Sequence, residues 1–237
     1  MPSNMYENAK TWNSAVGCRY GCVYCEASFQ RQLKRVAGTL NCPDCYSYTP
    51  HYHPERLKRI PSSPIVLVCG TGDISFYEPR FVWNIFMAIE AHKPRMAKTY
   101  YFQSKNPECF EQYLDWFNEH QDKVILLTTL ETNRNKGYEE ISLAPLPTRR
   151  FWDFHELDYP RKVVTIEPAL DMDPEIMATW MILLKKQGSL EYVWFGYDSK
   201  DCGLAGPRTE KAQQLVDLLQ ENGIEVRGKT LRDVKIG

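Results

Sequence analysis

Three closely spaced cysteines are the residues of this sequence best suited to chemistry. They lie in the segment Cys18-Arg-Tyr-Gly-Cys22-Val-Tyr-Cys25. Three thiolates at this spacing can ligate three irons of a 4Fe-4S cube and leave the fourth iron without a protein ligand. Because an open iron can bind a substrate or cofactor directly, the spacing predicts an iron–sulfur centre with a chemical role.

The same cysteines also fit a zinc site. Cys22 and Cys25 are followed further along the chain by Cys42-Pro-Asp-Cys45, and two Cys-x2-Cys pairs at this separation are typical of a four-cysteine zinc ribbon. A third interpretation is that the cysteines are only buried or regulatory thiols. Local spacing leaves these interpretations open.

A proline-rich insertion at residues 39–64 carries the second cysteine pair and is expected to be irregular. His51 and His53 follow Cys42 and Cys45 within it. Two cysteines and two histidines can form a small, separate zinc site, whereas the cysteine pair alone can act in redox chemistry. A second metal site and a redox pair are therefore the alternatives for this insertion.

The composition is that of a globular protein without extreme charge. The 237 residues include 29 Lys and Arg against 30 Asp and Glu, so no global basic field favours nucleic acid. Eight unevenly placed cysteines do not suit a disulfide scaffold, and no apolar run resembles a signal peptide or membrane span. We expect a cytoplasmic protein with reduced thiols and no membrane partner.

Strand and helix patterns alternate along most of the chain. A first helix is expected at residues 26–37, ended by Gly38. Apolar strand patterns occur at residues 11–16, 65–69, 98–102, 124–130, 161–166 and 192–195, with a short seventh at 224–227. Helical patterns lie between the later strands, at residues 79–92, 107–120, 147–157, 174–187 and 209–222. This alternation predicts an α/β fold, an incomplete parallel (β/α)6 barrel in a single domain 1–237 with the insertion 39–64.

The barrel favours the cluster over the zinc ribbon, because the cysteine loop becomes its first βα loop and shares a face with the other strand ends. The three cysteines, with the aromatic Tyr24 directly before the last, resemble the signature of the radical S-adenosylmethionine (SAM) superfamily. This resemblance implies that SAM chelates the open iron and is cleaved by an electron from the cluster. The resulting 5′-deoxyadenosyl radical then abstracts a substrate hydrogen. It also implies a partial barrel, a reductant such as flavodoxin or ferredoxin, and packing of Tyr24 near the adenine.

The resemblance assigns further residues to SAM binding. Gly70-Thr-Gly72-Asp73 stands where the family has a glycine-rich element that receives the SAM ammonium group, with Asp73 in place of the usual Glu. The alternative is a tight turn in which Asp73 caps a helix. Strand-end residues implied to bind the SAM carboxylate and ribose are Ser104, Lys105, Thr129 and Glu131, although any βα barrel carries polar residues at these positions.

Later strand ends supply candidates for the substrate. Glu167, Asp198 and Lys229 are expected to contact it, together with Tyr197. Tyr197 or Cys202 is the candidate catalytic residue that returns a hydrogen atom to a substrate radical. Cys69 and Cys109 are interpreted as structural.

Within the superfamily, the order of motifs resembles a phage- and prokaryote-associated group related to spore photoproduct lyase, which implies a nucleic-acid substrate. The Cys42/Cys45 insertion and the neutral charge depart from that pattern. Basic residues at 31–35, 56–59 and 149–150, interleaved with aromatic residues, are the candidate binding surface; the aromatic residues are Tyr46, Tyr48, Tyr52, Phe151 and Trp152. The first hypothesis is a radical SAM enzyme acting on a nucleic-acid base. The alternatives are the same chemistry on a small metabolite or peptide, and a zinc-ribbon binding protein on an inactive barrel.

Overall fold

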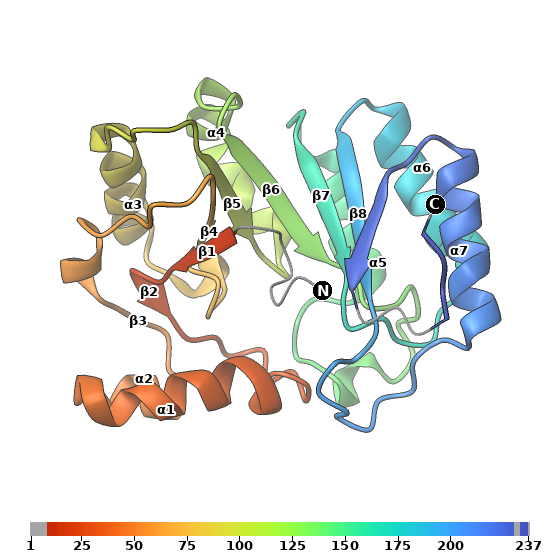
Figure 1. Ribbon diagram of the computed structural model, residues 1–237, viewed down its shortest axis with the longest axis horizontal. Helices are drawn as coiled ribbons and strands as arrows, with labels where there is room; N and C mark the ends of the chain where they lie inside the picture. Colours follow the sequence, from red (N-terminus) through yellow and green to blue (C-terminus); the bar gives the residue numbers. More distant parts are fainter. Residues whose placement is uncertain (1–8, 230–232, 237) are drawn as a thin grey trace.

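A curled parallel sheet forms the centre of the computed structural model, which describes residues 9–229 and 233–236. In this part of the chain the sheet has seven strands in the order β1-β4-β5-β6-β7-β8-β9. Their bounds are Ala9–Trp12, Ile65–Val68, Thr99–Gln103, Val124–Thr129, Lys162–Ile166, Leu190–Gly196 and Val226–Lys229. The outer strands β1 and β9 each pair on one side only, so the barrel is open (Figure 1). The predicted partial barrel, with its seventh strand, is confirmed.

The N-terminal region differs from the prediction. The expected strand at residues 11–16 is two strands, β1 and β2 (Ala15–Val16), and β2 pairs antiparallel with β3 (His51–Tyr52) in the insertion. The chain leaves the barrel between them, where the Ser14 carbonyl accepts a hydrogen bond from the His53 amide at 2.7 Å. The two-stranded sheet therefore ties the insertion to the segment that leads into the cysteine loop.

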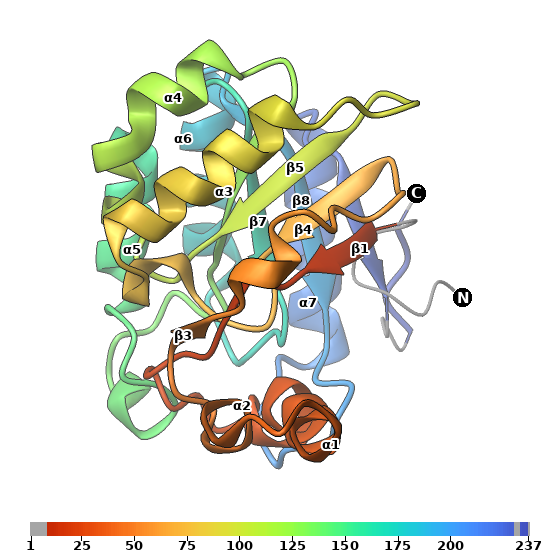
Figure 2. The same cartoon turned by 90° about the vertical axis from the view of Figure 1, so that its left-hand side faces the viewer.

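The first helix also ends later than predicted. A π-helical turn, Glu26–Gln30, leads into α1, Arg31–Leu40, which includes Gly38 and ends at Asn41 with a left-handed φ of 48°. Asn tolerates this conformation, so it serves as the helix end in place of glycine. The insertion, expected to be irregular, contains the short helix α2, Pro43–Ser47, beside α1 (Figure 2).

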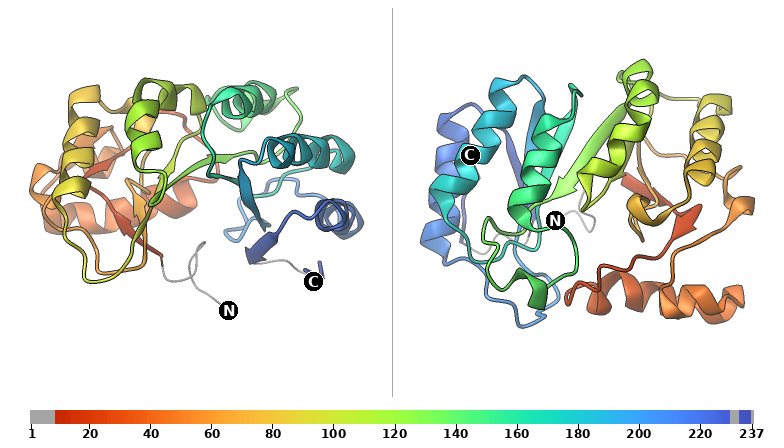
Figure 3. Two further views of the ribbon diagram at one scale, coloured as in Figure 1. Left: turned by 90° about the horizontal axis from the view of Figure 1, so that it is seen from above. Right: turned by 180° about the vertical axis from the view of Figure 1, so that it is seen from behind.

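Five later helices cover the outer face of the sheet, as Figure 3 shows from above. They are α3 (Pro79–Ala91), α4 (Leu114–Glu119), α5 (Pro147–Glu156), α6 (Pro174–Lys186) and α7 (Thr209–Glu221). The predicted helix at 107–120 begins as a 3₁₀ turn, Pro107–Tyr113. Aromatic packing fills the layer between helices and sheet, for example Phe86 on Trp116 with ring centroids 4.0 Å apart. None of the helices formed by described residues is long and apolar enough to cross a membrane.

Candidate active site

The cysteine loop lies directly against the turn that follows β4. Gly17 and Gly72 form a parallel bridge, and the Gly17 amide donates to the Thr71 carbonyl at 3.1 Å. A Cβ on Gly72 would lie 2.6 Å from the Gly17 oxygen and 1.9 Å from Tyr77 Oη. No side chain fits there, so Gly72 is required by the close approach of two backbones.

Gly70 is also sterically constrained. A Cβ at this position would lie 2.5 Å from the Leu67 side chain and 2.9 Å from that of Thr11. The glycines of the predicted SAM-binding element therefore each have a packing role at the carboxyl end of β4. Their contact with SAM stays a prediction.

All three cysteine sulfurs have polar neighbours, from distant segments or from the loop itself. The buried Cys22 Sγ lies 3.1 Å from Ser142 Oγ and accepts from Lys105 Nζ at 3.4 Å. Cys18 Sγ accepts from the Tyr20 amide at 3.4 Å. Hydrogen bonds to cysteine sulfurs are one means by which proteins stabilise iron–sulfur clusters.

The third sulfur, Cys25 Sγ, lies 3.7 Å from Tyr48 Oη in the insertion. Burial raises the pKa of both Cys18 and Cys25, and Asp73 raises that of Cys18 further. Thiolates in such surroundings are stable only with a bound cation to compensate their charge. One buried and two half-buried cysteines with polar side chains or amides beside them therefore fit a 4Fe-4S cluster held by three protein ligands.

A buried ion network adjoins Cys22. Glu131 and Arg150 are both fully buried, with Arg150 Nη2 2.9 Å from Glu131 Oε2. The other carboxylate oxygen contacts Lys105 Nζ and Tyr24 Oη, and Tyr138 Oη donates to both oxygens at 3.2 Å. Burial alone would raise the pKa of Glu131, but Arg150 and Lys105 together outweigh burial and hold it at about 2. Glu131 is therefore ionised at neutral pH.

Lys105 connects this network to the cysteine loop. Its Nζ contacts Tyr24 Oη, lies 4.6 Å from the centroid of the Tyr24 ring, and donates to Cys22 Sγ. Burial would lower the pKa of Lys105, but Glu131 and Cys22 raise it, so the ammonium group is charged. The structure thus brings together Tyr24, Lys105 and Glu131, three residues that the sequence predicted from separate segments.

Asp73 is a structural cap in this structure. Its carboxylate accepts four hydrogen bonds: from the Ser75 amide (3.0 Å), Ser75 Oγ (2.7 Å), Ser104 Oγ (2.7 Å) and the Lys105 amide (2.8 Å). These bonds use the usual acceptor capacity of a carboxylate. Asp73 and Ser104 therefore fasten the ends of β4 and β5 together, as the capping alternative predicted. Their contact with SAM stays a prediction, and Asp73 would have to exchange one of these bonds.

Thr129 and Glu167 are also engaged by neighbouring strands. Thr129 Oγ1 accepts from Gln103 Nε2 at 2.8 Å and lies 2.8 Å from Thr165 Oγ1. Glu167 Oε2 accepts from Trp194 Nε1 at 2.5 Å. These contacts order the carboxyl ends of β5 to β8.

The two candidate hydrogen-atom donors lie in different surroundings. Tyr197 is 1% exposed and packs in the core on the helix side of the sheet, so a substrate cannot reach it in this conformation. Cys202 is half-buried, with Sγ 4.0 Å from the Tyr24 carbonyl oxygen and its amide donating to Asp198 at 2.5 Å. Cys202 is therefore placed beside the cysteine loop. The Lys229 side chain lies outside the described residues.

The candidate nucleic-acid surface is wrong in three of its members. Arg150 and Phe151 are fully buried and Tyr48 is 7% exposed, whereas Arg149 and Trp152 face solvent. Helical periodicity could have indicated that Arg150 is buried. Arg150 lies on the same face of α5 as Phe154, four residues on, and that face packs on the sheet. Other site residues that the sequence analysis missed are Tyr138 and Ser142, which lie in a loop without periodicity.

The zinc-ribbon alternative is also contradicted. In the described part of the chain, the cysteine, histidine and acidic side chains close enough to share one metal ion are Cys42, Cys45, His51 and His53. Cys42 and Cys45 thus group with the histidines of the insertion, and Cys22 groups with Lys105 and Ser142. The two cysteine pairs belong to separate sites.

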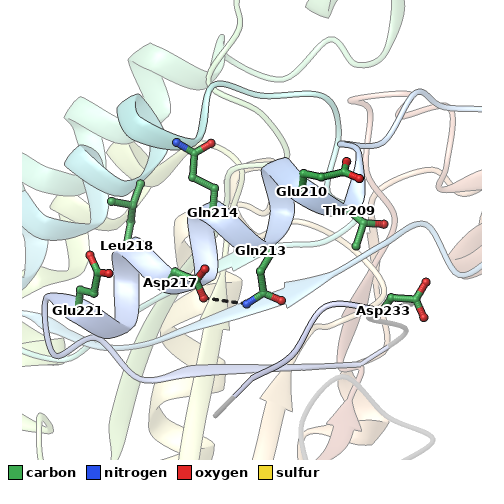
Figure 4. A pocket seen from close by; sticks show the side chains of 8 residues that line it. All are labelled: Thr209, Glu210, Gln213, Gln214, Asp217, Leu218, Glu221 and Asp233. Atoms are coloured by element: carbon green, nitrogen blue, oxygen red, sulfur yellow. Dashed lines mark hydrogen bonds between the residues drawn. The ribbon is translucent and has the colours of Figure 1, made fainter.

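A surface pocket lies away from this site (Figure 4). It runs along the outer face of α7 and is lined by Thr209, Glu210, Gln213, Gln214, Asp217, Leu218, Glu221 and Asp233. Its four carboxylates give it a negative potential, and none of the predicted site residues lines it. The pocket is therefore not part of the candidate active site.

Comparisons with known proteins support the fold. No protein-family model and no curated protein matches the chain. Among solved structures, a mutant of spore photoproduct lyase with bound AdoMet and dinucleoside spore photoproduct matches with a TM-score of 0.51 and 14% identity. The match covers 89% of this chain and 61% of the lyase chain, so this chain spans about three fifths of that protein. The shared half-barrel is shown; membership of the phage-associated group stays a prediction.

Proposed function

We propose that the protein is a radical SAM enzyme. The observation that carries this proposal is the position of the three cysteines at the carboxyl ends of a half-barrel, with Cys22 joined through Lys105 to Tyr24 and Glu131. The similarity of the fold to a lyase solved with AdoMet supports it.

Cys18, Cys22 and Cys25 would hold the cluster, which supplies the electron for reductive cleavage of SAM when bound. The side chains around the cysteines fix their geometry. Lys105 and Ser142 form polar contacts with the sulfur of Cys22, and burial limits the access of water to that sulfur. An iron–sulfur site of this kind is shaped by its protein through charge, hydrogen bonds and solvent exposure.

The residues for SAM follow from the charged network. Lys105 provides a half-buried cation beside Cys22 for the SAM carboxylate, and the Tyr24 ring provides an apolar face for the adenine. Glu131 and Arg150 hold Lys105 in place from the other side. Both oxygens of the fully buried Glu131 are already bonded, so a ribose hydroxyl would have to replace one of its partners. The network orders the site before SAM binds, which lowers the entropic cost of binding.

Replacement of Lys105 tests this arrangement. We expect Lys105→Met to weaken SAM binding to the reconstituted protein by about tenfold or more, because a charge-assisted contact is lost. The measurement is isothermal titration of SAM under anaerobic conditions, with iron and sulfide content as a check on cluster assembly.

The matched control is Lys98→Met. Lys98 is buried, but it lies before β5, at the opposite end of the strand from Lys105, and donates to the carbonyls of Pro61 and Ser63 at 2.7 Å. Equal SAM affinities for wild type and Lys105→Met, at equal cluster content, would overturn the assignment of Lys105.

For the substrate we propose a nucleic-acid base, supported by the dinucleoside bound to the structurally similar lyase. Cys202 is then the hydrogen-atom donor, because its thiol lies beside the cysteine loop and burial raises its pKa, which favours the S–H form. The test is salt-dependent binding of single-stranded oligonucleotides. Absence of that binding would favour the small metabolite or peptide.

A flavodoxin or ferredoxin is the proposed electron donor.

A further inference from the structure

We propose that Cys42, Cys45, His51 and His53 form a structural zinc site that fastens the insertion beneath the cysteine loop. Their ligand atoms all lie within 4.8 Å of one another. His51 Nε2 is 3.3 Å from both Cys42 Sγ and Cys45 Sγ, and His53 Nε2 is 3.2 Å from Cys45 Sγ. Tetrahedral zinc with ordinary Zn–S and Zn–N bonds places its ligand atoms about 3.3–3.8 Å apart, within a few tenths of an ångström of the three Nε2–Sγ distances.

Local structure explains why the four side chains converge. Cys42 caps α2 and Cys45 lies three residues on, in its first turn, where the Cys45 amide donates to Cys42 Sγ at 3.4 Å. His51 and His53 are two residues apart in an extended segment that begins with β3, so their side chains point to the same side of the chain. A short helix and a short strand thus present two ligands each to one point.

The tautomers of the histidines point to a cation between them. His51 Nδ1 lies 2.7 Å from the Thr49 carbonyl oxygen, which only accepts, so Nδ1 carries the hydrogen and Nε2 of the neutral ring carries a lone pair. His53 Nδ1 lies 3.4 Å from the Glu55 carboxylate, which gives the same tautomer. The two Nε2 atoms are only 3.0 Å apart. Two lone pairs at that distance repel unless a cation binds both.

The hydrogen bonds at Nδ1 also match the usual surroundings of zinc-bound histidine, in which a carbonyl or carboxylate orients each ring. Four protein ligands leave no open position, which is typical of structural rather than catalytic zinc. Two thiolates and two neutral imidazoles balance the charge of Zn²⁺. The occupied site therefore has no net charge, so one of its ligands, Cys45, can be 0% exposed.

The site adjoins the segment that leads into the cysteine loop and the small core on which the loop packs. β3 pairs His51 with Val16 and Tyr52 with Ala15, directly before the loop. The Cys18 amide donates to the Tyr48 carbonyl at 3.2 Å. Tyr48 and Cys45 also pack with Val16 and Leu33 in one small core, against which Cys18 and Cys25 lie. Zinc at this position would order the segment that holds the iron–sulfur ligands.

The experiment is metal analysis of the full chain purified from zinc-supplemented medium. We expect about one zinc per chain in the wild type and in the triple variant Cys18→Ser/Cys22→Ser/Cys25→Ser, which cannot hold the cluster. We expect Cys45→Ser and His53→Ala to lose the zinc, and the control Cys202→Ser, at a cysteine outside the group, to keep it. Cobalt substitution should give the thiolate charge-transfer band of a tetrahedral site in the triple variant.

Three results would overturn the proposal. The first is the absence of zinc from both the wild type and the triple variant. The second is zinc in the wild type but none in the triple variant, and the third is a Cys42–Cys45 disulfide in the purified chain. If Cys45→Ser does not fold, the wild type provides the test. Removal of metal by a chelator should make Cys42 and Cys45 reactive toward a thiol reagent, as mapped by mass spectrometry, and unchanged reactivity would also overturn it. Zinc without any iron–sulfur cluster would refute the proposed function and leave this inference intact.

Discussion

Glu131 is the residue on which the polar part of the site depends. It is fully buried and receives a guanidinium, an ammonium and two phenol groups, all from other segments of the chain. A buried carboxylate is stable only when its partners compensate the loss of water, so each of these contacts affects the stability of the fold as well as the site. The sequence identified Glu131 by its place after a strand, but it assigned Arg150, whose partner lies 19 positions away, to the candidate nucleic-acid surface.

Arg150→Met should destabilise the protein by about 3–5 kcal/mol, because it leaves the Glu131 charge buried beside Lys105 alone. The measurement is urea unfolding at neutral pH. The control is Arg80→Met, because Arg80 and its partner Glu78 are both exposed and their pair is screened by water. Similar losses of stability for the two variants would contradict the buried network.

Lys162 gives a prediction for the dependence of stability on pH. Burial lowers its pKa from 10.5 to about 8, while its Nζ donates to the Leu157 carbonyl at 2.6 Å, beyond the end of α5. Because the unfolded chain binds this proton more tightly, burial of the charged lysine costs stability at neutral pH, and the cost disappears as the pH rises from about 8 to 10.5.

The unfolding free energy of the wild type should therefore rise relative to that of Lys162→Met between about pH 7 and about pH 9.5. The difference between the two proteins is the quantity to measure, because the cysteines titrate in both. A constant difference across this range would show that Lys162 is not desolvated.

At the scale of elements, the turn after β4 and the cysteine loop act as one unit. Gly72→Ala should destabilise the protein by about 1–3 kcal/mol, because the new methyl group meets the Gly17 backbone and Tyr77. It should also lower the iron bound after reconstitution, since the cysteine loop must move. Urea unfolding and iron analysis measure the two effects.

Gly38→Ala is the control for this substitution. Gly38 lies in α1 with open space around the position of a Cβ, so alanine there should stabilise the helix by about 0.5–1 kcal/mol and leave iron binding unchanged. Equal behaviour of the two alanine variants would mean that the Gly17–Gly72 contact does not position the loop.

The elements also show where sequence reasoning succeeds. The strand β6 was predicted within a few residues because its six buried residues form a continuous run. The helix α3 was predicted equally well because it begins with proline. The pairing of β2 with β3 was not predicted, because it joins two-residue strands from distant segments. The end of α1 at Asn41 was missed because Gly38 is a stronger local signal than the left-handed Asn.

For the whole molecule, the βα alternation gave the half-barrel, and the half-barrel brought the candidate residues together. Lys105 and Glu131 meet because they follow the neighbouring strands β5 and β6 of the parallel sheet, and the cysteine loop brings Tyr24 to them. The burial of single side chains could not be predicted in the same way: Tyr197 follows β8 but turns into the core, and Arg150 lies on the buried face of α5. The face on which a side chain lies depends on packing between elements. A local sequence pattern of charged and aromatic residues does not determine this packing.

The central claim is that the cysteine loop holds a cluster that cleaves SAM. Its most direct test is to reconstitute the protein with iron and sulfide without oxygen, add dithionite and SAM, and measure 5′-deoxyadenosine by mass spectrometry. We predict that wild type and the control Cys109→Ala form this product and that Cys18→Ala does not. A wild type that assembles no cluster, or product formed equally by Cys18→Ala, would contradict the account.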